Sequence, residues 1–249
     1  MVGILGGMGP AAGADFVRLF VAACADHMAA LHMEVSDQAY PEHWLAQVPI
    51  PDRTAALIEH SVDGVSRVDR AGAHQPGEPM LQALGRLAAL GVRVVAIACN
   101  TAHAWHGLLQ KRFPQILVLH GVQEVAADLA QRKVTRVGLL ATQGAYAAGL
   151  YQQALTNVGI DCFLPTSDER DQLMQGIYDG VKTGNLVLAR ARFGHVARVL
   201  QQRHGVSIII MGCTEIPLAL SGAPGFEDLV LVNPSAVLAA VLARHAYQD

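Results

Sequence analysis

Two stretches of this sequence end alike, in a cysteine followed by polar residues: Val94-Val95-Ala96-Ile97-Ala98-Cys99-Asn100-Thr101 and Ile208-Ile209-Ile210-Met211-Gly212-Cys213-Thr214-Glu215. A continuous apolar run precedes each cysteine, which is typical of a strand buried in a parallel sheet. The polar residues that follow are typical of the start of a helix. The sequence therefore predicts two buried strands, each carrying a thiol at its carboxyl end.

The elements around these stretches also repeat. The opening Val2-Gly3-Ile4-Leu5-Gly6-Gly7 resembles Val137-Gly138-Leu139-Leu140-Ala141-Thr142, and each of the two precedes one cysteine stretch. Short apolar runs alternate with helical patterns along the chain, which indicates parallel βαβ units. We therefore expect an α/β protein of two similar Rossmann-like domains with mainly parallel sheets. The first, residues 1–117 with 226–249, contributes Cys99, and the second, residues 118–225, contributes Cys213.

Apolar runs predict strands at Val2–Leu5, Arg93–Ala98, Ile116–His120, Val134–Ala141, Asp161–Leu164, Val206–Met211 and Leu229–Val232. Helices are expected between them, at Pro10–His32, Ala102–Phe113, Val122–Gln131, Ala147–Asn157, Asp168–Gly184, Leu186–His204 and Ser235–His245. The two openings lie further apart than the two cysteine stretches, so the first half holds extra material. Its expected place is the polar, proline-rich stretch Ala39–Pro79, which is typical of a loop.

Composition narrows the class of protein. The chain has 249 residues, of which 52% are hydrophobic and 16% charged, with a net charge of −3. This hydrophobic fraction excludes a disordered chain, and the weak charge favours neither a nucleic acid nor a membrane partner. No apolar run approaches the roughly 20 residues that span a bilayer, and the first residues lack the basic stretch of a secretory signal. We expect a cytoplasmic protein.

The chemistry is expected at Cys99 and Cys213, because open α/β sheets bind ligands beyond the carboxyl ends of their strands. A helix start favours the thiolate form of a cysteine. One thiolate could remove a proton from a carbon while the other thiol delivers one to the opposite face, which inverts a stereocentre without a cofactor. The alternative is that these cysteines are small core side chains, which is our interpretation of Cys24 and Cys162. No cysteine pair has C-x-x-C metal spacing, so we expect no metal.

The two cysteine motifs resemble the paired signatures of the aspartate/glutamate racemase family. The motifs are Ala98–His103 and Gly212–Pro217, and four further stretches are similar: Gly3–Pro10, Pro49–Thr54, Leu140–Thr142 and Gly176–Gly184. Together they cover almost the whole chain in order, and the last two of the four fit the aspartate racemase branch. The resemblance implies a cofactor-independent racemase, with aspartate as the first expected substrate and glutamate as the second. It also implies two α/β domains related by a pseudo-two-fold axis, an active site in the cleft between them, and a homodimer.

The resemblance implies a role for each matching residue. Cys99 and Cys213 form the acid–base pair, and the α-carboxylate is bound by the backbone of Gly7 and Met8 and by the side chains of Asn100, Thr101, Thr142 and Thr214. Arg53 and Lys182 are expected to recognise the side-chain carboxylate, since a guanidinium binds a carboxylate with two hydrogen bonds and an ammonium adds a point charge. The alternative for each is a solvated loop cation.

Several positions depart from the family pattern. The stretch Val35–Pro49 is longer and more aromatic than expected, and Asp69–Pro79 is rich in glycine, histidine and proline, so the preference for aspartate over glutamate stays open. Gln143 follows Thr142 where a second hydroxyl residue is common. Glu215 stands where glutamate racemases have histidine. It would assist proton transfer, bind the substrate ammonium or only favour a helix start, whereas His103 is expected to be structural.

Three rival functions stay open. The pattern Gly7-x-Gly9-x-x-Ala12, with Asp37 as a ribose ligand, matches a loose dinucleotide fingerprint, but Pro10 lacks the amide that a pyrophosphate would use. A dicarboxylate isomerase or decarboxylase of the same superfamily is the second rival, although a decarboxylase needs only one proton donor. The third is a non-catalytic module that binds acidic amino acids.

Overall fold

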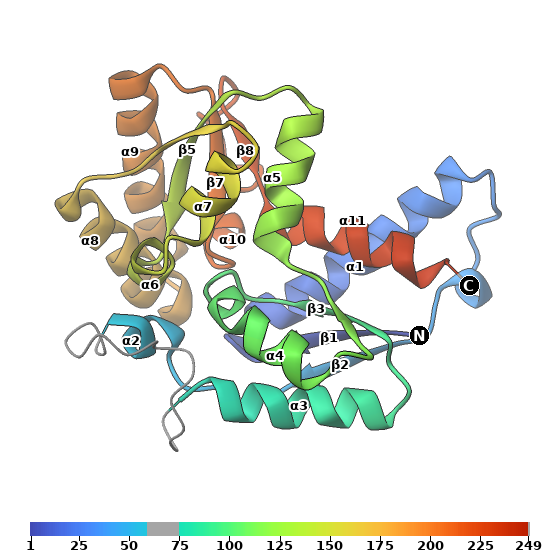
Figure 1. Ribbon diagram of the computed structural model, residues 1–249. Coiled ribbons are helices and arrows are strands. Elements are labelled where there is room, and N and C mark those ends of the chain that lie inside the picture. Colours follow the sequence, from blue (N-terminus) through green and yellow to red (C-terminus); the bar gives the residue numbers. More distant parts are fainter. Residues whose placement is uncertain (59–74, 249) are drawn as a thin grey trace. The chain divides into compact units, whose positions relative to one another are not determined.

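The computed structural model describes residues 1–58 and 75–248, which fold as two compact units (Figure 1). The first unit comprises Met1–Glu124 and Ser235–Asp249, and the second comprises Val125–Pro234. The boundaries expected from the sequence, at 117/118 and 225/226, lie a few residues earlier in the chain. The second of these differs because the strand Val230–Val232 pairs within the second unit.

The first unit contains a four-stranded parallel sheet in the order β2-β1-β3-β4. Its strands are β1 (Val2–Gly6), β2 (His43–Gln47), β3 (Val94–Ile97) and β4 (Leu117–Val118). The helices of this part of the chain are α1 (Pro10–Ala30), α2 (Arg53–Ile58), α3 (Gly77–Ala89), α4 (His106–Arg112), α5 (Gly121–Gln131) and α11 (Pro234–Ala246), with 3-10 turns η1 (Asp37–Ala39) and η2 (Thr101–Trp105). The chain passes into the second unit within α5.

Helices cover both faces of this sheet, so its strands are buried on two sides. Ile4 of β1 packs in a cluster with residues of α1 and α11, whereas the next residue, Leu5, packs with residues of α3 and α4. Ala96 and Ile97 of β3 divide between the same two clusters, because successive side chains of a strand point to opposite faces. Figure 1 shows α1 and α11 together on one side of the sheet and α3 on the other.

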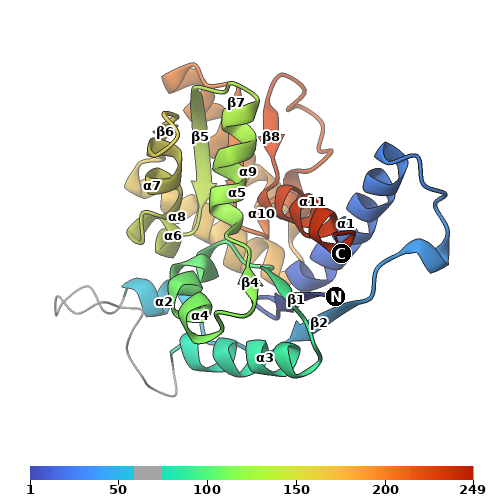
Figure 2. The same cartoon turned by 45° about the vertical axis from the view of Figure 1, so that its right-hand side comes forward.

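The second unit contains a parallel sheet with the corresponding strand order, β6-β5-β7-β8 (Figure 2). The strands are β5 (Arg136–Ala141), β6 (Asp161–Phe163), β7 (Ile208–Gly212) and β8 (Val230–Val232). The connecting elements are α6 (Gln143–Ala147), α7 (Leu150–Thr156), α8 (Ser167–Gln175), the π-turn η3 (Gly176–Gly180), the 3-10 turn η4 (Val181–Thr183), α9 (Leu186–His204) and α10 (Ile216–Leu220). The predicted α/β fold with two similar parallel-sheet halves is confirmed.

The stretch Ala39–Pro79 differs from the loop expected there. It contains the edge strand β2, the helix α2 and the start of α3, while residues 59–74 lie outside the described part of the chain. The sequence of β2, His43-Trp44-Leu45-Ala46-Gln47, has no buried residue, because only one of its edges pairs with the sheet. An exposed edge strand lacks the continuous apolar run that reveals a central strand.

Two predicted helices are interrupted. The stretch Ala147–Asn157 is divided between α6 and α7, because Gly149 adopts a φ of +63° that ends the first helix. The stretch Asp168–Gly184 is α-helical only to Gln175, then widens into the π-turn η3 and tightens into the 3-10 turn η4. The predicted helix Ala102–Phe113 begins as the 3-10 turn η2 and continues as α4. The remaining predicted strands and helices lie at the expected places, with ends shifted by a few residues.

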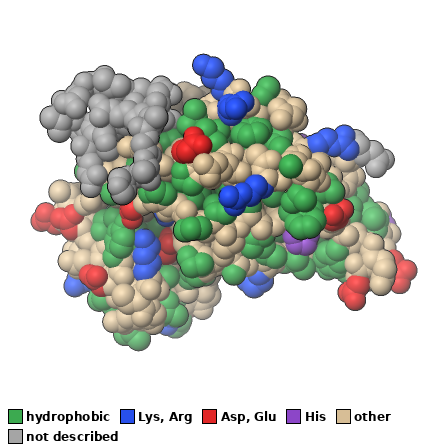
Figure 3. Space-filling view, turned by 90° about the horizontal axis from the view of Figure 1, so that it is seen from below, with side chains coloured by type: hydrophobic (Ala, Val, Ile, Leu, Met, Phe, Trp, Pro, Cys, Tyr) green, Lys and Arg blue, Asp and Glu red, His purple; other side chains and the backbone are tan. Residues whose placement is uncertain are grey.

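Two observations bear on partners. Within residues 1–58 and 75–248, no helix is long and apolar enough to cross a membrane. On the face drawn in Figure 3, the basic and acidic side chains of the described residues are scattered among hydrophobic and polar ones. That face therefore presents no basic stripe of the kind that binds nucleic acid.

Candidate active site

Several of the residues singled out in the sequence follow the strands at the switch point of each sheet. The chain leaves β1 towards β2 on one side and leaves β3 towards β4 on the other, so the carboxyl ends of β1 and β3 border the place where ligands bind in such sheets. Gly7 and Met8 follow β1, and Cys99 follows β3. In the second unit, Thr142 follows β5 and Cys213 follows β7 in the same way.

The two cysteines follow corresponding strands. In the first unit the last residue pair between β1 and β3 is Leu5 with Ile97, and Cys99 comes two residues after Ile97. In the second unit the last pair between β5 and β7 is Ala141 with Gly212, and Cys213 comes directly after Gly212. Each cysteine therefore follows a strand that pairs with the first strand of its own sheet.

Cys99 is buried, with 6% of its surface exposed, and its backbone is tightly held. Its N–H donates to the carbonyl of Ile97 at 2.8 Å. Asn100 and Thr101 are buried as well and lead into the 3-10 turn η2. The carbonyl of Asn100 accepts two hydrogen bonds from His103, one from its backbone N–H at 3.1 Å and one from its ring Nδ1 at 3.1 Å. The Cys99 loop is thus a short, fully packed turn.

The loop after β1 can be formed only by glycine at its first position. Gly7 has a φ of +93°, and a Cβ there would lie 1.9 Å from the carbonyl oxygen of Val48. The next carbonyl, of Met8, accepts a hydrogen bond from Nη2 of Arg53 at 2.6 Å. Backbone therefore passes close to backbone at this strand end, as a backbone-lined binding site requires.

Arg53 begins α2 and holds three main-chain carbonyls. Besides the Met8 carbonyl, its Nη1 donates to the carbonyls of Ile50 at 3.1 Å and Pro51 at 3.0 Å. A guanidinium has five N–H donors, so these bonds account for three of them. The structure brings Arg53 to the Gly7–Met8 loop and gives it a bracing role there. Its predicted role as a carboxylate ligand stays a prediction.

Thr142 caps the helix that follows β5. Its Oγ1 accepts a hydrogen bond from the N–H of Ala145 at 3.1 Å, and its side chain is buried. The hydroxyl of Tyr146 braces the same strand end, since it donates to the carbonyl of Leu139 at 2.9 Å and accepts from the N–H of Ala141 at 2.8 Å. Burial raises the pKa of this hydroxyl. Sequence reasoning missed Tyr146, whose i+4 spacing from Thr142 places both on one helix face.

Gln143 stands where a second hydroxyl residue was expected, and its side chain turns to α8. Its Nε2 donates to Oδ1 of Asp171 at 2.7 Å. Its backbone N–H donates to the sulfur of Met174 at 3.4 Å. The side chain of Gln143 therefore fixes α8 at the end of β5 rather than adding a hydroxyl beside Thr142.

Cys213 has a carboxylate partner. Its Sγ donates to Oε2 of Glu215 at 3.0 Å, and the hydroxyl of Thr214 donates to the same oxygen at 2.9 Å. All three residues are buried, with Cys213 exposing 5% of its surface. Glu215 precedes α10 but makes no side-chain capping bond to it. The carboxylate is therefore directed at the thiol and not at the amides of α10.

Lys182 lies in the second unit, on η4. Its Nζ is 3.9 Å from the centre of the Tyr178 ring, a cation–π contact. The preceding π-turn packs closely on α9, since a Cβ at Gly180 would lie 2.8 Å from the Cβ of Ala189. Single π-turns are frequent at functional sites, because they redirect side chains out of the helical pattern.

Other kinds of site have no support among the described residues. None of the four cysteines, all within the described residues, forms a disulfide. In the part of the chain that the structure describes, no group of three or more His, Cys, Asp or Glu side chains is arranged to hold a metal ion. Asp37 lies in η1, before β2, whereas ligands of such sheets bind at the carboxyl ends of strands, so the dinucleotide interpretation loses its ribose ligand.

Comparison with known proteins identifies the family. Residues 5–242 match the model of the Asp/Glu/hydantoin racemase family. The chain belongs to this family. The solved structure of Picrophilus torridus aspartate racemase is similar over 100% of this chain and 94% of its own, with a TM-score of 0.76 and 25% sequence identity.

Two curated relatives match different shares of this chain. The broad specificity amino-acid racemase RacX of Bacillus subtilis is 24% identical over 240 residues, which cover 96% of this chain and 95% of RacX. An uncharacterised protein of Pectobacterium carotovorum is 43% identical, but only over 86 residues, so this chain matches just 56% of that protein's length and 34% of its own. The predicted enzyme class, an amino-acid racemase that works without pyridoxal phosphate, is that of the family.

Proposed function

We propose that this protein racemises an acidic amino acid, with aspartate preferred over glutamate. Of Cys99 and Cys213, one removes the α-proton and the other donates a proton to the opposite face of the α-carbon. The observation that carries the proposal is the equivalence of the two thiols. Each follows a central strand of a sheet, and the two sheets have corresponding strand orders. Each is buried beside polar residues at the strand end where such sheets bind ligands.

The reaction needs two proton carriers and no redox partner. One cysteine, as thiolate, takes the α-hydrogen as a proton and leaves the electron pair on the α-carbon. The other cysteine, as thiol, donates its proton to the opposite face, so the product is the mirror image and the two cysteines have exchanged protonation states. The next turnover then runs in the reverse sense, or the thiols equilibrate with water first.

The polar residues beside the thiols supply the stabilisation that such a carbanion needs. Asn100, Thr101 and Thr142 are buried and neutral, and with the amides of Gly7 and Met8 they would donate to the α-carboxylate. Thr214 would join them once its hydroxyl, which donates to Glu215, turns to the substrate. Negative charge from the α-carbon spreads onto that carboxylate in the transition state. Fixed donors that need no reorganisation lower the barrier most in a site with little water.

Glu215 is proposed as the proton partner of Cys213. Its Oε2 already accepts the hydrogen bond from Sγ, so it is placed to hold the thiol proton when the thiolate form is needed. The preference for an acidic substrate rests on Arg53 and Lys182, whose positive charges would meet its second carboxylate. The preference for aspartate over glutamate rests on the resemblance of Leu140–Thr142 and Gly176–Gly184 to the aspartate racemase branch. A homodimer, implied by the family resemblance, is part of the proposal, and sedimentation of the purified protein tests it.

The proposal is tested by incubating the protein with L-aspartate in deuterium oxide. We expect D-aspartate carrying deuterium at the α-carbon, with slower exchange of glutamate. Absence of α-exchange with aspartate, glutamate and neutral amino acids would contradict the proposal. Saturable binding of aspartate by calorimetry, without exchange, would indicate a binding module. Conversion of maleate or a malonate derivative would indicate the related isomerase or decarboxylase.

A further inference from the structure

His103 follows Cys99 by four residues and has a place in the fold that the proposed chemistry does not use. We infer that His103 is a positioning residue: its neutral ring fixes the Asn100–Thr101 peptide, the second after Cys99, restrains through it the direction of the Cys99 thiol, and joins that peptide to the start of α5. The inference rests on the proposed function, because the direction of the thiol matters only if Cys99 moves a proton.

The hydrogen bonds define which nitrogen of the ring carries the hydrogen. The backbone N–H of Gly121 donates to Nε2 of His103 at 2.9 Å, so Nε2 must be the unprotonated, accepting nitrogen. Nδ1 then carries the hydrogen and donates to the carbonyl of Asn100 at 3.1 Å. The ring thus joins two main-chain segments that are separated along the chain, one at each nitrogen.

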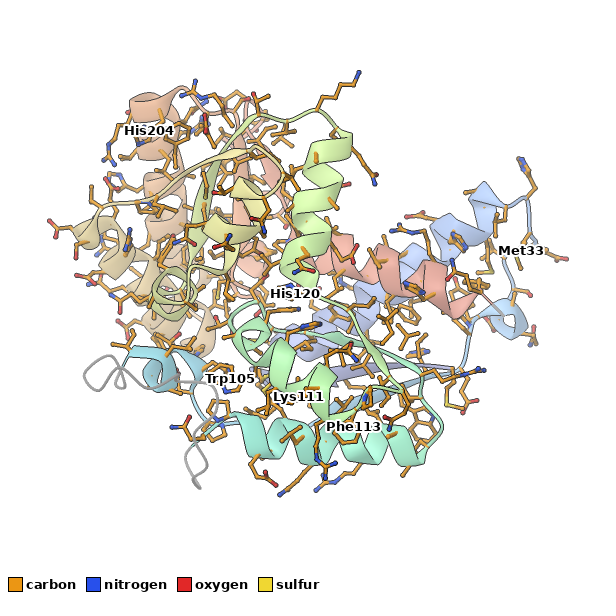
Figure 4. All side chains as sticks on the ribbon, in the orientation of Figure 1. Met33, Trp105, Lys111, Phe113, His120 and His204 are labelled. Carbon is orange, nitrogen blue, oxygen red and sulfur yellow. The ribbon has the colours of Figure 1, made fainter. Side chains whose placement is uncertain are left out.

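The ring stays neutral at physiological pH. His103 exposes only 3% of its surface, and its ring centre lies 5.2 Å from that of His120, which immediately precedes α5 (Figure 4). Burial, together with the nearby His120 and His106, lowers the pKa of His103 to about 3. The side chain is therefore unsuited to carry protons during the reaction, and its two hydrogen bonds remain in place over the working pH range.

Gly121 is shaped to receive this ring. A Cβ at Gly121 would lie 3.1 Å from both Cε1 and Nε2 of His103 and 3.0 Å from Cδ2 of Leu238, closer than most such contacts. Gly121 is also the first residue of α5, where backbone N–H groups have no partner within the helix. His103 supplies that partner. The ring thereby links the Cys99 loop to the helix in which the chain enters the second unit.

The second unit has no equivalent device. The residue four positions after Cys213 is Pro217, in α10, which has neither a ring N–H nor a ring acceptor. Cys213 is instead held through its side chain by Glu215. The His103 link is therefore specific to the Cys99 loop, and its loss should affect Cys99 alone.

Two conservative variants separate the two bonds. In His103→Asn, the side-chain amide reaches the place of Nδ1 and can still donate to the Asn100 carbonyl. In His103→Gln, the side-chain oxygen reaches the place of Nε2 and can accept from Gly121, but nothing donates to Asn100. We expect kcat for aspartate racemisation to fall about 10- to 100-fold in His103→Gln and to stay within about threefold of wild type in His103→Asn.

A second measurement does not require racemase activity. With Cys24, Cys162 and Cys213 all changed to serine, Cys99 is the one cysteine left, and its rate of alkylation by iodoacetamide reports the accessibility and direction of its thiol. We expect His103→Gln to change this rate and His103→Asn to preserve it. If the wild-type protein showed no α-exchange, the proposed function would fail, while this alkylation series would still test His103.

Controls decide between positioning and general stability. His106 belongs to the same ring cluster but bonds the carbonyl of Val118 at 2.7 Å, so His106→Ala should lower Tm and leave kcat near wild type. Gly121→Ala, which displaces the His103 ring without removing it, should lower kcat severalfold. The inference is overturned if folded His103→Gln matches wild type in kcat and Cys99 alkylation. It is also overturned if the Asn and Gln variants lose kcat equally, in proportion to their loss of Tm.

Discussion

The two cysteine loops occupy the same place in two sheets of corresponding strand order, yet their partners differ in kind. The Cys99 loop is fixed through its main chain by the neutral ring of His103. The Cys213 thiol is bound through its side chain by the carboxylate of Glu215. Two loops at corresponding places are therefore held in different ways, one through its main chain and the other through its side chain.

The largest effect is expected from removing either thiol. Cys99→Ala and Cys213→Ala should each lower racemisation of aspartate by about 10²- to 10⁴-fold, because each removes one of two obligatory proton carriers. Steady-state polarimetry measures the loss. Cys162→Ser serves as the matched control, since Cys162 lies in β6 away from the strand ends considered, and it should stay near wild type. Full activity in either alanine variant would refute the two-base account.

The next largest effect is expected from changing Glu215, the carboxylate that bonds Cys213. Glu215→Gln keeps the size of the side chain and an oxygen that can accept from Cys213, but it cannot take up a proton. We expect kcat to fall about 10- to 100-fold, little change in KM, and a shifted limb in the pH–rate profile. A normal kcat with a raised KM would instead assign Glu215 to the substrate ammonium, the alternative role that the sequence suggested.

A smaller effect, on KM, is expected from removing a cation that would recognise the substrate side chain. Lys182→Met should raise KM for aspartate about tenfold or more and leave neutral amino acids little affected, because it removes a charge-assisted contact to the side-chain carboxylate. Lys111→Met, a change of an exposed lysine on α4, is the control and should leave both values unchanged. If Lys182→Met and Lys111→Met behaved alike, Lys182 would be the solvated cation of the alternative interpretation.

The smallest effect on activity is expected at the other buried carboxylate of the second unit, Glu169. It forms a capping box with Thr166 and an ion pair with Arg203, and the hydrogen bond from Arg203 holds its pKa below the ordinary value. A lowered folded-state pKa stabilises the protein at neutral pH, and this contribution is lost as the pH falls through that pKa. Glu169→Gln should therefore cost about 1–3 kcal/mol at pH 7 and less in acid, with kcat unchanged.

Urea unfolding of wild type and Glu169→Gln at pH 7 and in acid measures this difference. An equal cost at both pH values would contradict the linkage to ionisation. Compared with Glu215→Gln, this variant separates a carboxylate that stabilises the fold from one that takes part in the reaction.

The sequence predicts the centre of each sheet better than its edge. The runs before Cys99 and Cys213 are buried on both faces, so their apolar residues are continuous and their strands are found at the expected places. The strand β2 was missed because Trp44 and Leu45 are exposed at the sheet edge, where hydrophobic patterning is weak. A buried central strand can be predicted from its own apolar run. An edge strand forms by pairing with a strand that is distant in the sequence, so its own residues predict it poorly.

Some residues of the candidate site can also be predicted from the sequence, and others cannot. The sequence identifies Cys99, Cys213 and Glu215 as candidate site residues because their reactive groups are in their side chains. Glu215 is also only two residues from Cys213. The partners of Arg53 and His103 are main-chain carbonyls and an N–H, which every residue carries and no sequence pattern marks. His103 was expected to be structural, and only the structure reveals that what it holds is the loop of a proposed catalytic thiol.

The central claim, that two thiols act on opposite faces of one carbon, is tested most directly by solvent exchange in the single-cysteine variants. Cys99→Ala and Cys213→Ala are each incubated with L-aspartate and with D-aspartate in deuterium oxide, and α-deuterium is measured without and with inversion. The account predicts that each variant exchanges one enantiomer without inverting it, and that the two variants exchange opposite enantiomers. Exchange of the same enantiomer by both variants, or inversion by either variant as fast as its exchange, would contradict it.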